Sequence, residues 1–248
     1  MAKRSFFDGP LYTITNYIYW FALSNIYFML LNFLFIFFLM TPPVDASQGY
    51  SSGYYVLLFI VSLPIGPTIT ALLSVMGKII REKDVSVTRE YFKSLKQSFK
   101  QSFLAWFIEL LLIVIMLGDI KFFGTRSYGA FLIPIFYVFI IIILILGLYV
   151  FPIISRFYLK LSDVYKLAFY YAIKKFKVTL FNIFAIVASV FLMKMMPSIV
   201  IIFLGSIICY MIMLNEKDVL KELEDRITDA SAASEGEDKA DEENNIEE

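Results

Sequence analysis

The chain has 248 residues, of which 59% are hydrophobic and only 18% are charged, and its 22 Lys and Arg residues balance 22 Asp and Glu residues. Soluble domains carry roughly 25% charged residues, so this composition excludes an ordinary soluble protein and indicates several membrane-spanning segments. Histidine is absent, which excludes Ser–His and Cys–His catalysis and imidazole metal sites.

Uncharged runs along the chain predict six membrane-spanning helices, because a spanning helix needs about 20 mostly apolar residues. The expected spans are 18–40, 54–77, 101–118, 130–151, 178–196 and 197–214. Pro197 favours a tight turn before the last span, since proline is well placed in the first turn of a helix. The predicted fold is an all-α, polytopic membrane helical bundle.

Two segments between the spans predict basic amphipathic helices, 86–103 and 162–177. In the first, Phe92 and Phe99 recur at helical spacing while lysines occupy other faces. In the second, the apolar stripe consists of Val164, Leu167, Ala168 and Tyr171. Such helices dock a partner, bind anionic lipid headgroups, or simply lie flat at the membrane surface. Nucleic-acid binding is not expected, because membrane topology already accounts for these lysines.

The distribution of basic residues predicts the orientation of the chain in the membrane. Placing the N-terminus in the cytoplasm puts 19 of the 22 Lys and Arg residues on the cytoplasmic side. We therefore expect a multi-pass protein with both termini in the cytoplasm. The predicted parts are an N-terminal cytoplasmic or interfacial segment 1–17, a six-helix membrane domain 18–214, a short cytoplasmic helix 215–229 and an acidic disordered tail 230–248.

The predicted helix 215–229 and the predicted tail 230–248 differ in their pattern of apolar and charged residues. The segment 215–227 has one apolar stripe at helical spacing, formed by Val219, Leu220, Leu223 and Ile227. Residues 230–248 contain eight acids and one lysine. Such a segment has too little apolar surface to fold alone, so we expect it to be disordered.

Glu109 is the only acid within a predicted span. A carboxylate at that depth is costly, so it is expected to be protonated, paired or in contact with a wet cavity. One interpretation is a proton or cation site in a transporter. The other is a single buried carboxyl group that is hydrogen-bonded to a neighbouring Tyr, Asn or Lys side chain.

Proline and glycine predict a bend or a break in the second span, where Pro64, Gly66 and Pro67 fall close together. A broken helix can expose backbone N–H groups to a ligand, and it is equally common as a kink that neighbouring helices satisfy. Pro152 predicts a second bend, followed by Arg156 at the inner surface. Four polar side chains within the spans are expected to form interhelical hydrogen bonds, namely Asn25, Asn32, Asn182 and Ser189. None of these residues forms a catalytic constellation, and the chain has no G-x-x-x-x-G-K-[ST] phosphate loop.

Two segments carry a family resemblance: IGPTITALLSVMGKIIREKDVSVTREYFKSLKQSFKQS at 65–102 and YVFPIISRF at 149–157. Together they resemble the YesL-like family of small bacterial membrane proteins, over roughly 16–214. The insert at 41–53 and the acidic tail depart from the family pattern. The matching positions are Gly66, Pro67, Ala71, Lys78, Arg81, Phe92, Phe99, Phe151, Pro152 and Arg156.

The resemblance implies a non-enzymatic accessory subunit of a carbohydrate ABC importer in the bacterial cytoplasmic membrane. Its expected partners are the permease subunits and membrane lipids, with no cofactor, metal or nucleotide bound by this chain. A proton- or cation-coupled carrier that uses Glu109 and a regulatory membrane scaffold are the alternatives. The candidate functional positions are Gly66, Pro67, Lys78, Arg81, Phe92, Phe99, Glu109, Pro152 and Arg156.

Overall fold

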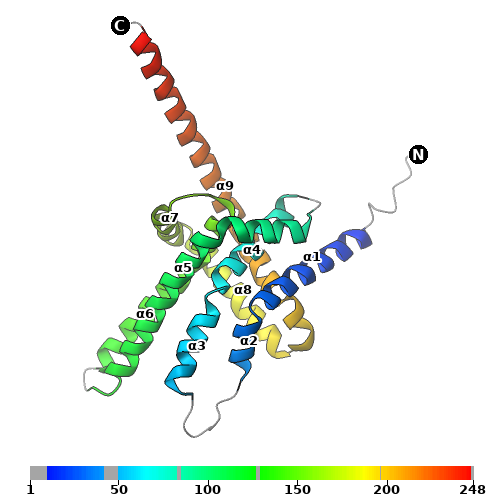
Figure 1. The fold of residues 1–248 in the computed structure, drawn as a ribbon, viewed down its shortest axis with the longest axis vertical. Coiled ribbons are helices and arrows are strands. Elements are labelled where there is room, and N and C mark those ends of the chain that lie inside the picture. Colours follow the sequence, from blue (N-terminus) through cyan, green and yellow to red (C-terminus); the bar gives the residue numbers. More distant parts are fainter. Residues whose placement is uncertain (1–9, 42–49, 83–84, 127–128, 196, 247–248) are drawn as a thin grey trace.

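The computed structural model describes residues 10–41, 50–82, 85–126, 129–195 and 197–246. The regular elements in these ranges are helices: α1 (Pro10–Leu31), α2 (Phe33–Met40), α3 (Ser52–Ser62), α4 (Ile65–Arg81), α5 (Val87–Phe123), α6 (Gly129–Arg156), α7 (Leu161–Lys174), α8 (Phe176–Met195) and α9 (Pro197–Ile246). They form a bundle from which α9 projects at one end, while α5 and α6 extend side by side toward the other end (Figure 1). The prediction of an all-α chain is confirmed over these residues.

Several helices are long and apolar enough to cross a membrane. Four stretches meet this condition on their own: Gly53–Arg81, Val87–Phe123, Gly129–Arg156 and Phe176–Met195. The bent pair of α1 and α2 adds a fifth if it is counted as one span. The predicted span 197–214 forms the beginning of α9 and is not among these stretches. Four or five membrane-length helices are therefore present in the described part of the chain, and six stays a prediction.

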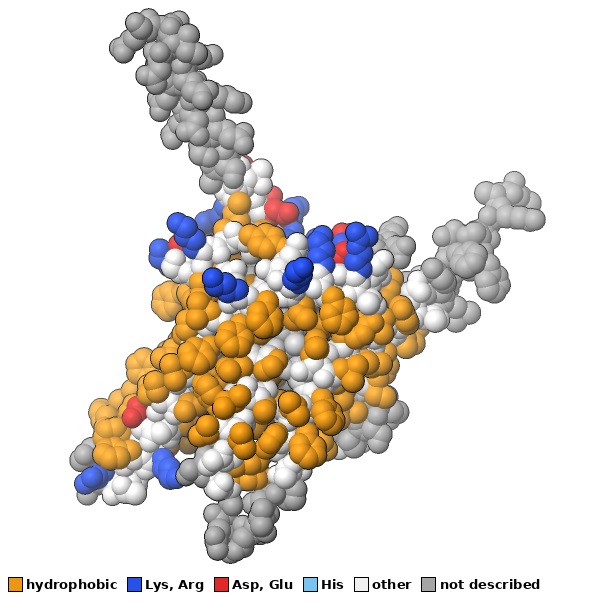
Figure 2. Space-filling model, in the orientation of Figure 1, with side chains coloured by type: hydrophobic (Ala, Val, Ile, Leu, Met, Phe, Trp, Pro, Cys, Tyr) orange, Lys and Arg blue, Asp and Glu red, His pale blue; other side chains and the backbone are white. Residues whose placement is uncertain are grey.

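Helix α4 lies at the centre of the bundle and packs against α1, α5, α6 and α9. Most of its apolar side chains are fully buried, including Leu72, Val75 and Met76. By contrast, large apolar side chains on α1, α2, α6 and α8 are exposed and give the molecule a wide apolar surface (Figure 2). An apolar exterior around a packed centre is expected of helices whose solvent is lipid.

The predicted bend or break in the second span is present as a short interruption at Leu63 and Pro64. Both residues keep right-handed helical dihedral angles, so Gly53–Arg81 still forms one membrane-length stretch. The interruption is tied to a bend elsewhere. The chain leaves helical hydrogen bonding between α3 and α4, and α1 and α2 meet at 73° on either side of Asn32. The Asn32 Nδ2 atom donates a hydrogen bond to Thr68 Oγ1 at 2.8 Å, and Thr68 Oγ1 donates to the Pro64 carbonyl at 2.9 Å. The Thr68 side chain of α4 therefore connects the two irregular points, and the Pro64 carbonyl also accepts from the Thr68 backbone N–H at 3.1 Å.

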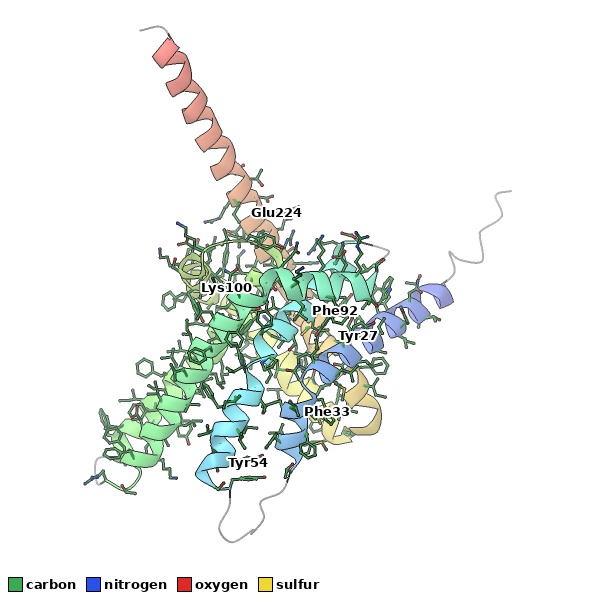
Figure 3. All side chains as sticks on the ribbon, in the orientation of Figure 1. Tyr27, Phe33, Tyr54, Phe92, Lys100 and Glu224 are labelled. Atoms are coloured by element: carbon green, nitrogen blue, oxygen red, sulfur yellow. The ribbon has the colours of Figure 1, made fainter. Side chains whose placement is uncertain are left out.

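The predicted amphipathic helix 86–103 is not separate from the next predicted span, 101–118. Both lie within α5, which runs without interruption through 37 residues, because no glycine or proline stands between them. Ser98 and Ser102 each donate a hydrogen bond to the carbonyl four residues earlier, at 2.8 and 2.7 Å. Such bonds often bend helices, and α5 changes direction near Lys100 (Figure 3).

Helix α9 has no boundary at residue 215 or at residue 230, where the sequence predicts a short helix and then a disordered tail. It is one helix of 50 residues. No proline interrupts the segment after Pro197, and Glu, Lys and Ala, which favour helices, are frequent in it. The predicted stripe is confirmed, since Val219, Leu220 and Leu223 are at most 2% exposed.

The other predicted boundaries have different outcomes. Helix α1 begins at Pro10, so the predicted division between residues 17 and 18 falls inside it. Residues 1–9, and 42–49 of the predicted insert 41–53, lie outside the described residues. Helix α7 corresponds closely to the predicted amphipathic helix 162–177, and three residues of its predicted stripe are fully buried, namely Val164, Ala168 and Tyr171.

Candidate functional site

The candidate residues at the proline break pack the first turn of α4 directly against α5. Gly66 and Pro67 are both buried. A Cβ atom on Gly66 would lie 2.4 Å from Trp106 Cβ and 2.6 Å from the Ser102 carbonyl oxygen. The Trp106 indole N–H also donates to the Ser62 carbonyl at 2.8 Å, at the end of α3. Trp106 thus packs the kink against α5 and gives the Ser62 carbonyl, at the interruption, a partner within the chain.

A second group of candidate residues meets where α4 and α6 end. Lys78 forms ion pairs with Glu90 at 2.9 Å and with Glu82 at 3.8 Å. Arg156 pairs with Glu224 of α9, and Arg81 lies close enough to interact electrostatically with Arg156. We call this region, where Lys78, Arg81 and Arg156 converge with their acidic partners, the basic end of the domain.

A polar hollow opens at the basic end, between α4, α5 and the end of α6. Its volume is about 80 Å³. It is lined by Ser74, Glu90, Lys93, Ser94, Gln97, Ser98, Ile154, Ser155, Arg156 and Tyr158. Nearly all of these side chains carry N–H or O–H groups, and the one carboxylate already pairs with Lys78. The hydroxyl groups of Ser98 and Ser155 already donate to the Ser94 and Pro152 carbonyls. The free donors of the hollow therefore come chiefly from Lys93, Gln97 and Arg156.

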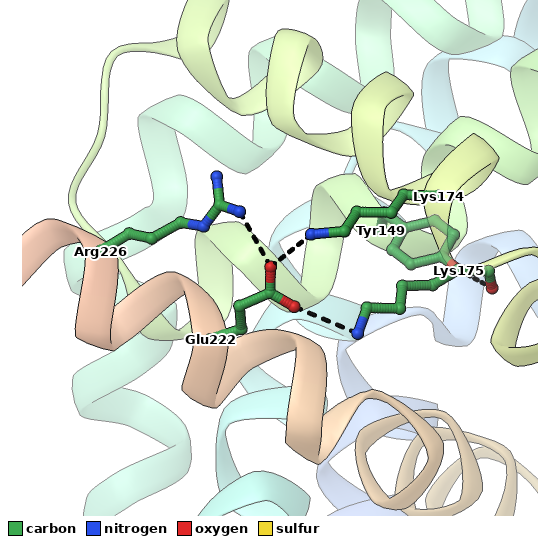
Figure 4. Close-up of polar contacts among 5 residues, drawn as sticks. All are labelled: Tyr149, Lys174, Lys175, Glu222 and Arg226. Carbon is green, nitrogen blue, oxygen red and sulfur yellow. Dashed lines mark hydrogen bonds and ion pairs between the residues drawn. The ribbon is translucent and has the colours of Figure 1, made fainter.

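Glu222 of α9 binds three basic groups beside α7 (Figure 4). Its carboxylate accepts from Lys174 Nζ at 2.7 Å and from Arg226 at 3.0 Å, and lies 3.1 Å from Lys175 Nζ. The hydrogen bond from Lys174, followed by that from Lys175, lowers the pKa of Glu222 from 4.5 to about 2. Sequence reasoning did not single out Glu222, because on a charged helix it looks like any other exposed acid.

We expect E222Q to loosen the contact between α7 and α9 in a pH-dependent way. Because folding lowers the pKa of Glu222, this contact contributes stability above pH 4.5 and loses it as the pH falls toward about 2. Amide hydrogen exchange in Leu161–Lys174 should be faster in E222Q than in wild type at pH 6, and equal in the two proteins near pH 2. Asp225, an exposed acid in the same turn, supplies the control D225N. Equal exchange at pH 6 would contradict the prediction.

A buried polar network joins α8 to α9. Asn182 Nδ2 donates to Glu216 Oε1 at 2.7 Å, and Asn215 Nδ2 donates to Asn182 Oδ1 at 2.9 Å. Glu216 has no exposed surface, and its Oε2 atom has no hydrogen-bond partner among the described residues. Glu216 lies beyond the predicted spans, and its burial raises its pKa well above the usual range. The network confirms the interhelical role of Asn182, whereas the burial of Glu216 was not predicted.

The other polar side chains expected between helices divide into two kinds. Asn25 donates across to the Ile201 carbonyl at 2.9 Å, and Asn32 bonds to Thr68, so both act between helices. Ser189 instead donates to the Ala185 carbonyl of its own helix at 2.7 Å. A serine hydroxyl can reach back one turn, so its presence in a span does not by itself predict an interhelical bond.

Glu109 is buried and packs between α5, α6 and α7. Tyr165 of α7 donates to Glu109 Oε1 at 3.5 Å and to the Ala105 carbonyl at 3.2 Å. Gly147 of α6 lies so close that a Cβ atom there would be 2.9 Å from Glu109 Oε2. Glu109 thus has the tyrosine partner that the structural interpretation expects, while the described residues hold no group of three or more acids or cysteines able to bind a metal.

The remaining candidate positions are two exposed phenylalanines and a buried proline. Phe92 and Phe99 are 43% and 49% exposed, and the buried face of this part of α5 carries Tyr91 and small serines instead. Phe92 packs against Tyr27 at a ring distance of 5.2 Å (Figure 3) and against the neighbouring Tyr91 at 5.7 Å. Small residues let helices approach closely while large apolar ones face lipid, so the apolar stripe faces outward. Pro152 is buried within α6.

The similarity of the chain to a known family covers part of its length. No curated protein and no solved structure matches the chain. The match to the family begins within α1, ends within α5 and includes the proline break, whereas Pro152 and Arg156 lie outside it. Residues 28–120 of this chain match the family described as "Protein of unknown function, DUF624".

Proposed function

We propose that this protein is a non-enzymatic accessory subunit in the bacterial cytoplasmic membrane that packs against the permease subunits of a carbohydrate ABC importer and supports their assembly or activity. The carbohydrate setting comes from the YesL-like resemblance, with which the DUF624 match is consistent. The proposed orientation keeps both termini and the basic end of the domain in the cytoplasm, following the distribution of Lys and Arg.

The observation that carries the proposal is a helical hairpin with little packing against the rest of the chain. We call residues 110–123 of α5 and 130–145 of α6 the hairpin arm. None of its residues is buried, and it extends away from the centre of the bundle (Figure 1). Burial in α6 is confined to Gly129 and to residues from Tyr149 to Ile154. The arm thus presents apolar faces on both helices to the surrounding bilayer or to other membrane subunits.

The internal polar groups support a structural role over a transport role. The proline break is closed by Trp106, Glu109 bonds to Tyr165, and Glu216 bonds to Asn182. Each group holds two helices together and lies inside the bundle, where it is unavailable to a passing solute. A carrier would need such groups to line a path across the membrane.

Loss of sugar uptake on deletion tests the proposal. Deleting the chain should abolish uptake of one carbohydrate while the solute-binding protein of that importer still binds it, and re-expression of wild type should restore uptake. A matched strain that lacks the importer ATPase shows how much uptake remains when the importer is fully inactive. Unchanged uptake of every candidate sugar would contradict an accessory role.

The carrier alternative depends on Glu109, so we expect E109Q to leave function intact. A glutamine at this position can still accept the hydrogen bond from Tyr165 and has nearly the same size. Uptake should therefore stay within about twofold of wild type, with E109L as the control that removes the acceptor. If E109Q abolished uptake driven by a pH gradient in liposomes that contain only this protein, a proton-coupled carrier would replace the proposal.

A further inference from the structure

We propose that the polar hollow at the basic end of the domain is a binding site for a phosphate-bearing anion. The inference concerns a ligand site of the chain itself and goes beyond the accessory role. The hollow collects donors from α5 and from the end of α6, with Lys93, Gln97 and Arg156 as the strongest. Its volume of about 80 Å³ is several times the roughly 10–15 Å³ that one water molecule needs by the same kind of measure, which leaves room for a compact group such as phosphate.

The charges around the hollow favour an anion. Glu90 is its only acid and is neutralised by Lys78 at 2.9 Å. Arg156 uses one nitrogen for Glu224, and its planar group has five N–H donors, so others stay available. Among the described residues, Lys93 forms no ion pair and the Gln97 amide makes no hydrogen bond. One free ammonium group and one partly free guanidinium group therefore face the same small space.

The depth of the hollow fits a ligand at the membrane surface. The membrane-length stretches Gly53–Arg81 and Gly129–Arg156 both end at this level. Basic side chains form a band there along the upper edge of the apolar surface (Figure 2). Tyr158, which is 73% exposed, stands at the rim, and tyrosine is enriched at the headgroup level of membranes.

Two sources could supply the same chemistry: the headgroup of an anionic phospholipid or a free phosphate ion. Arginine and lysine recognise phosphate oxygens through charge-assisted hydrogen bonds in either case. A basic residue near an anionic membrane surface contributes about 1 kcal/mol, which corresponds to about a fivefold change in affinity. Loss of Lys93 should have at least this effect on a ligand held in the hollow.

The test compares K93Q with K100Q in full-length protein purified in a non-ionic detergent. Lys100 is an exposed lysine of the same helix that does not line the hollow. In one arm, phosphatidylglycerol and phosphatidylcholine are added in equal amounts and native mass spectrometry counts the lipids retained. In the other arm, inorganic phosphate is titrated without lipid and the melting temperature is followed. Q97A removes a donor at unchanged charge and decides the matter if K93Q does not fold.

The site is supported if K93Q lowers retention of phosphatidylglycerol at least fivefold while K100Q matches wild type, which identifies a lipid headgroup. It is equally supported if phosphate raises the melting temperature of wild type but not of K93Q, with no lipid preference, which identifies the free ion. Q97A should weaken binding of the same ligand. The proposal would be overturned if K93Q and K100Q lost equal amounts of ligand binding, or if wild type bound neither phosphatidylglycerol nor phosphate.

Discussion

Replacing Gly66 with alanine should destabilise the protein more than the same substitution at any other described glycine in the centre of the bundle. The new Cβ would lie 2.4 Å from Trp106 Cβ and 2.6 Å from the Ser102 carbonyl oxygen. One of these obstacles is backbone, and the other is the first atom of a buried side chain, so neither can rotate away. Overpacking a well-packed core costs typically 1–3 kcal/mol, and we expect about 3 kcal/mol here.

The measurement is thermal unfolding of purified G66A and wild type in the same detergent, followed by tryptophan fluorescence. A loss of about 3 kcal/mol corresponds to a fall of about 6–12 °C in melting temperature for a chain of this size. G118A is the matched control, because a Cβ on Gly118 would meet nothing within 4 Å. A G66A protein that melts within 2 °C of wild type would show that α4 and α5 do not approach as described.

The second large effect on stability is expected at Glu216, and it depends on pH. Burial raises the pKa of Glu216 well above 4.5, so the unfolded chain releases this proton more readily than the folded chain. The carboxyl group therefore costs no stability below pH 4.5, and it lowers the free energy of unfolding as the pH rises from there toward its raised pKa. Each unit of difference in pKa is worth about 1.4 kcal/mol.

We expect E216Q to melt at a higher temperature than wild type at pH 8.5 and close to wild type at pH 5. The gain should reach at least about 3 °C, the shift expected for about 1 kcal/mol in a chain of this size. Glutamine keeps an acceptor for Asn182 without the ionisable group. D218N replaces an exposed acid of the same helix and should show no such pH dependence. A destabilised E216Q at pH 8.5 would mean that Glu216 is paired with a positive group in the folded protein.

Sequence reasoning predicted the elements that depend on local pattern. The proline break before α4 follows from missing backbone donors. The apolar stripes of α7 and of residues 219–223 in α9 follow from helical spacing. These helices pack at the basic end, where one face of each is buried and the other is polar. In that setting hydrophobic periodicity indicates the buried face.

The sequence pattern left open what the apolar stripe of 86–103 contacts. Phe92 and Phe99 lie on an exposed face of α5 while Ser98 and Ser102 pack inside, as expected of a helix whose apolar face lies toward the bilayer. In a bilayer, large apolar residues gain nothing by turning inward, and close helix packing selects small ones. The burial of Glu216 was not predictable from the sequence, because an acid that follows an apolar run is normally solvated. Only the three-dimensional contact with Asn182 distinguishes it from its neighbours.

The hairpin arm offers a way to separate partner contact from folding. G118W adds a large side chain to an open position of the arm and should leave the melting temperature of the isolated chain unchanged. V187W adds the same side chain to another exposed apolar position, on α8, where Val187 is 61% exposed. If the arm contacts the permease, G118W should reduce partner capture severalfold and V187W should not. Equal capture by both variants would place the contact elsewhere on the protein.

Capture of the chain from native membranes tests the central claim most directly. The membranes are extracted in mild detergent, the tagged full-length chain is isolated by affinity, and the bound proteins are identified and quantified by mass spectrometry. An accessory subunit should retain permease and ATPase subunits of one carbohydrate importer in near-stoichiometric amounts. A chain recovered alone, or only with further copies of itself, would contradict the account.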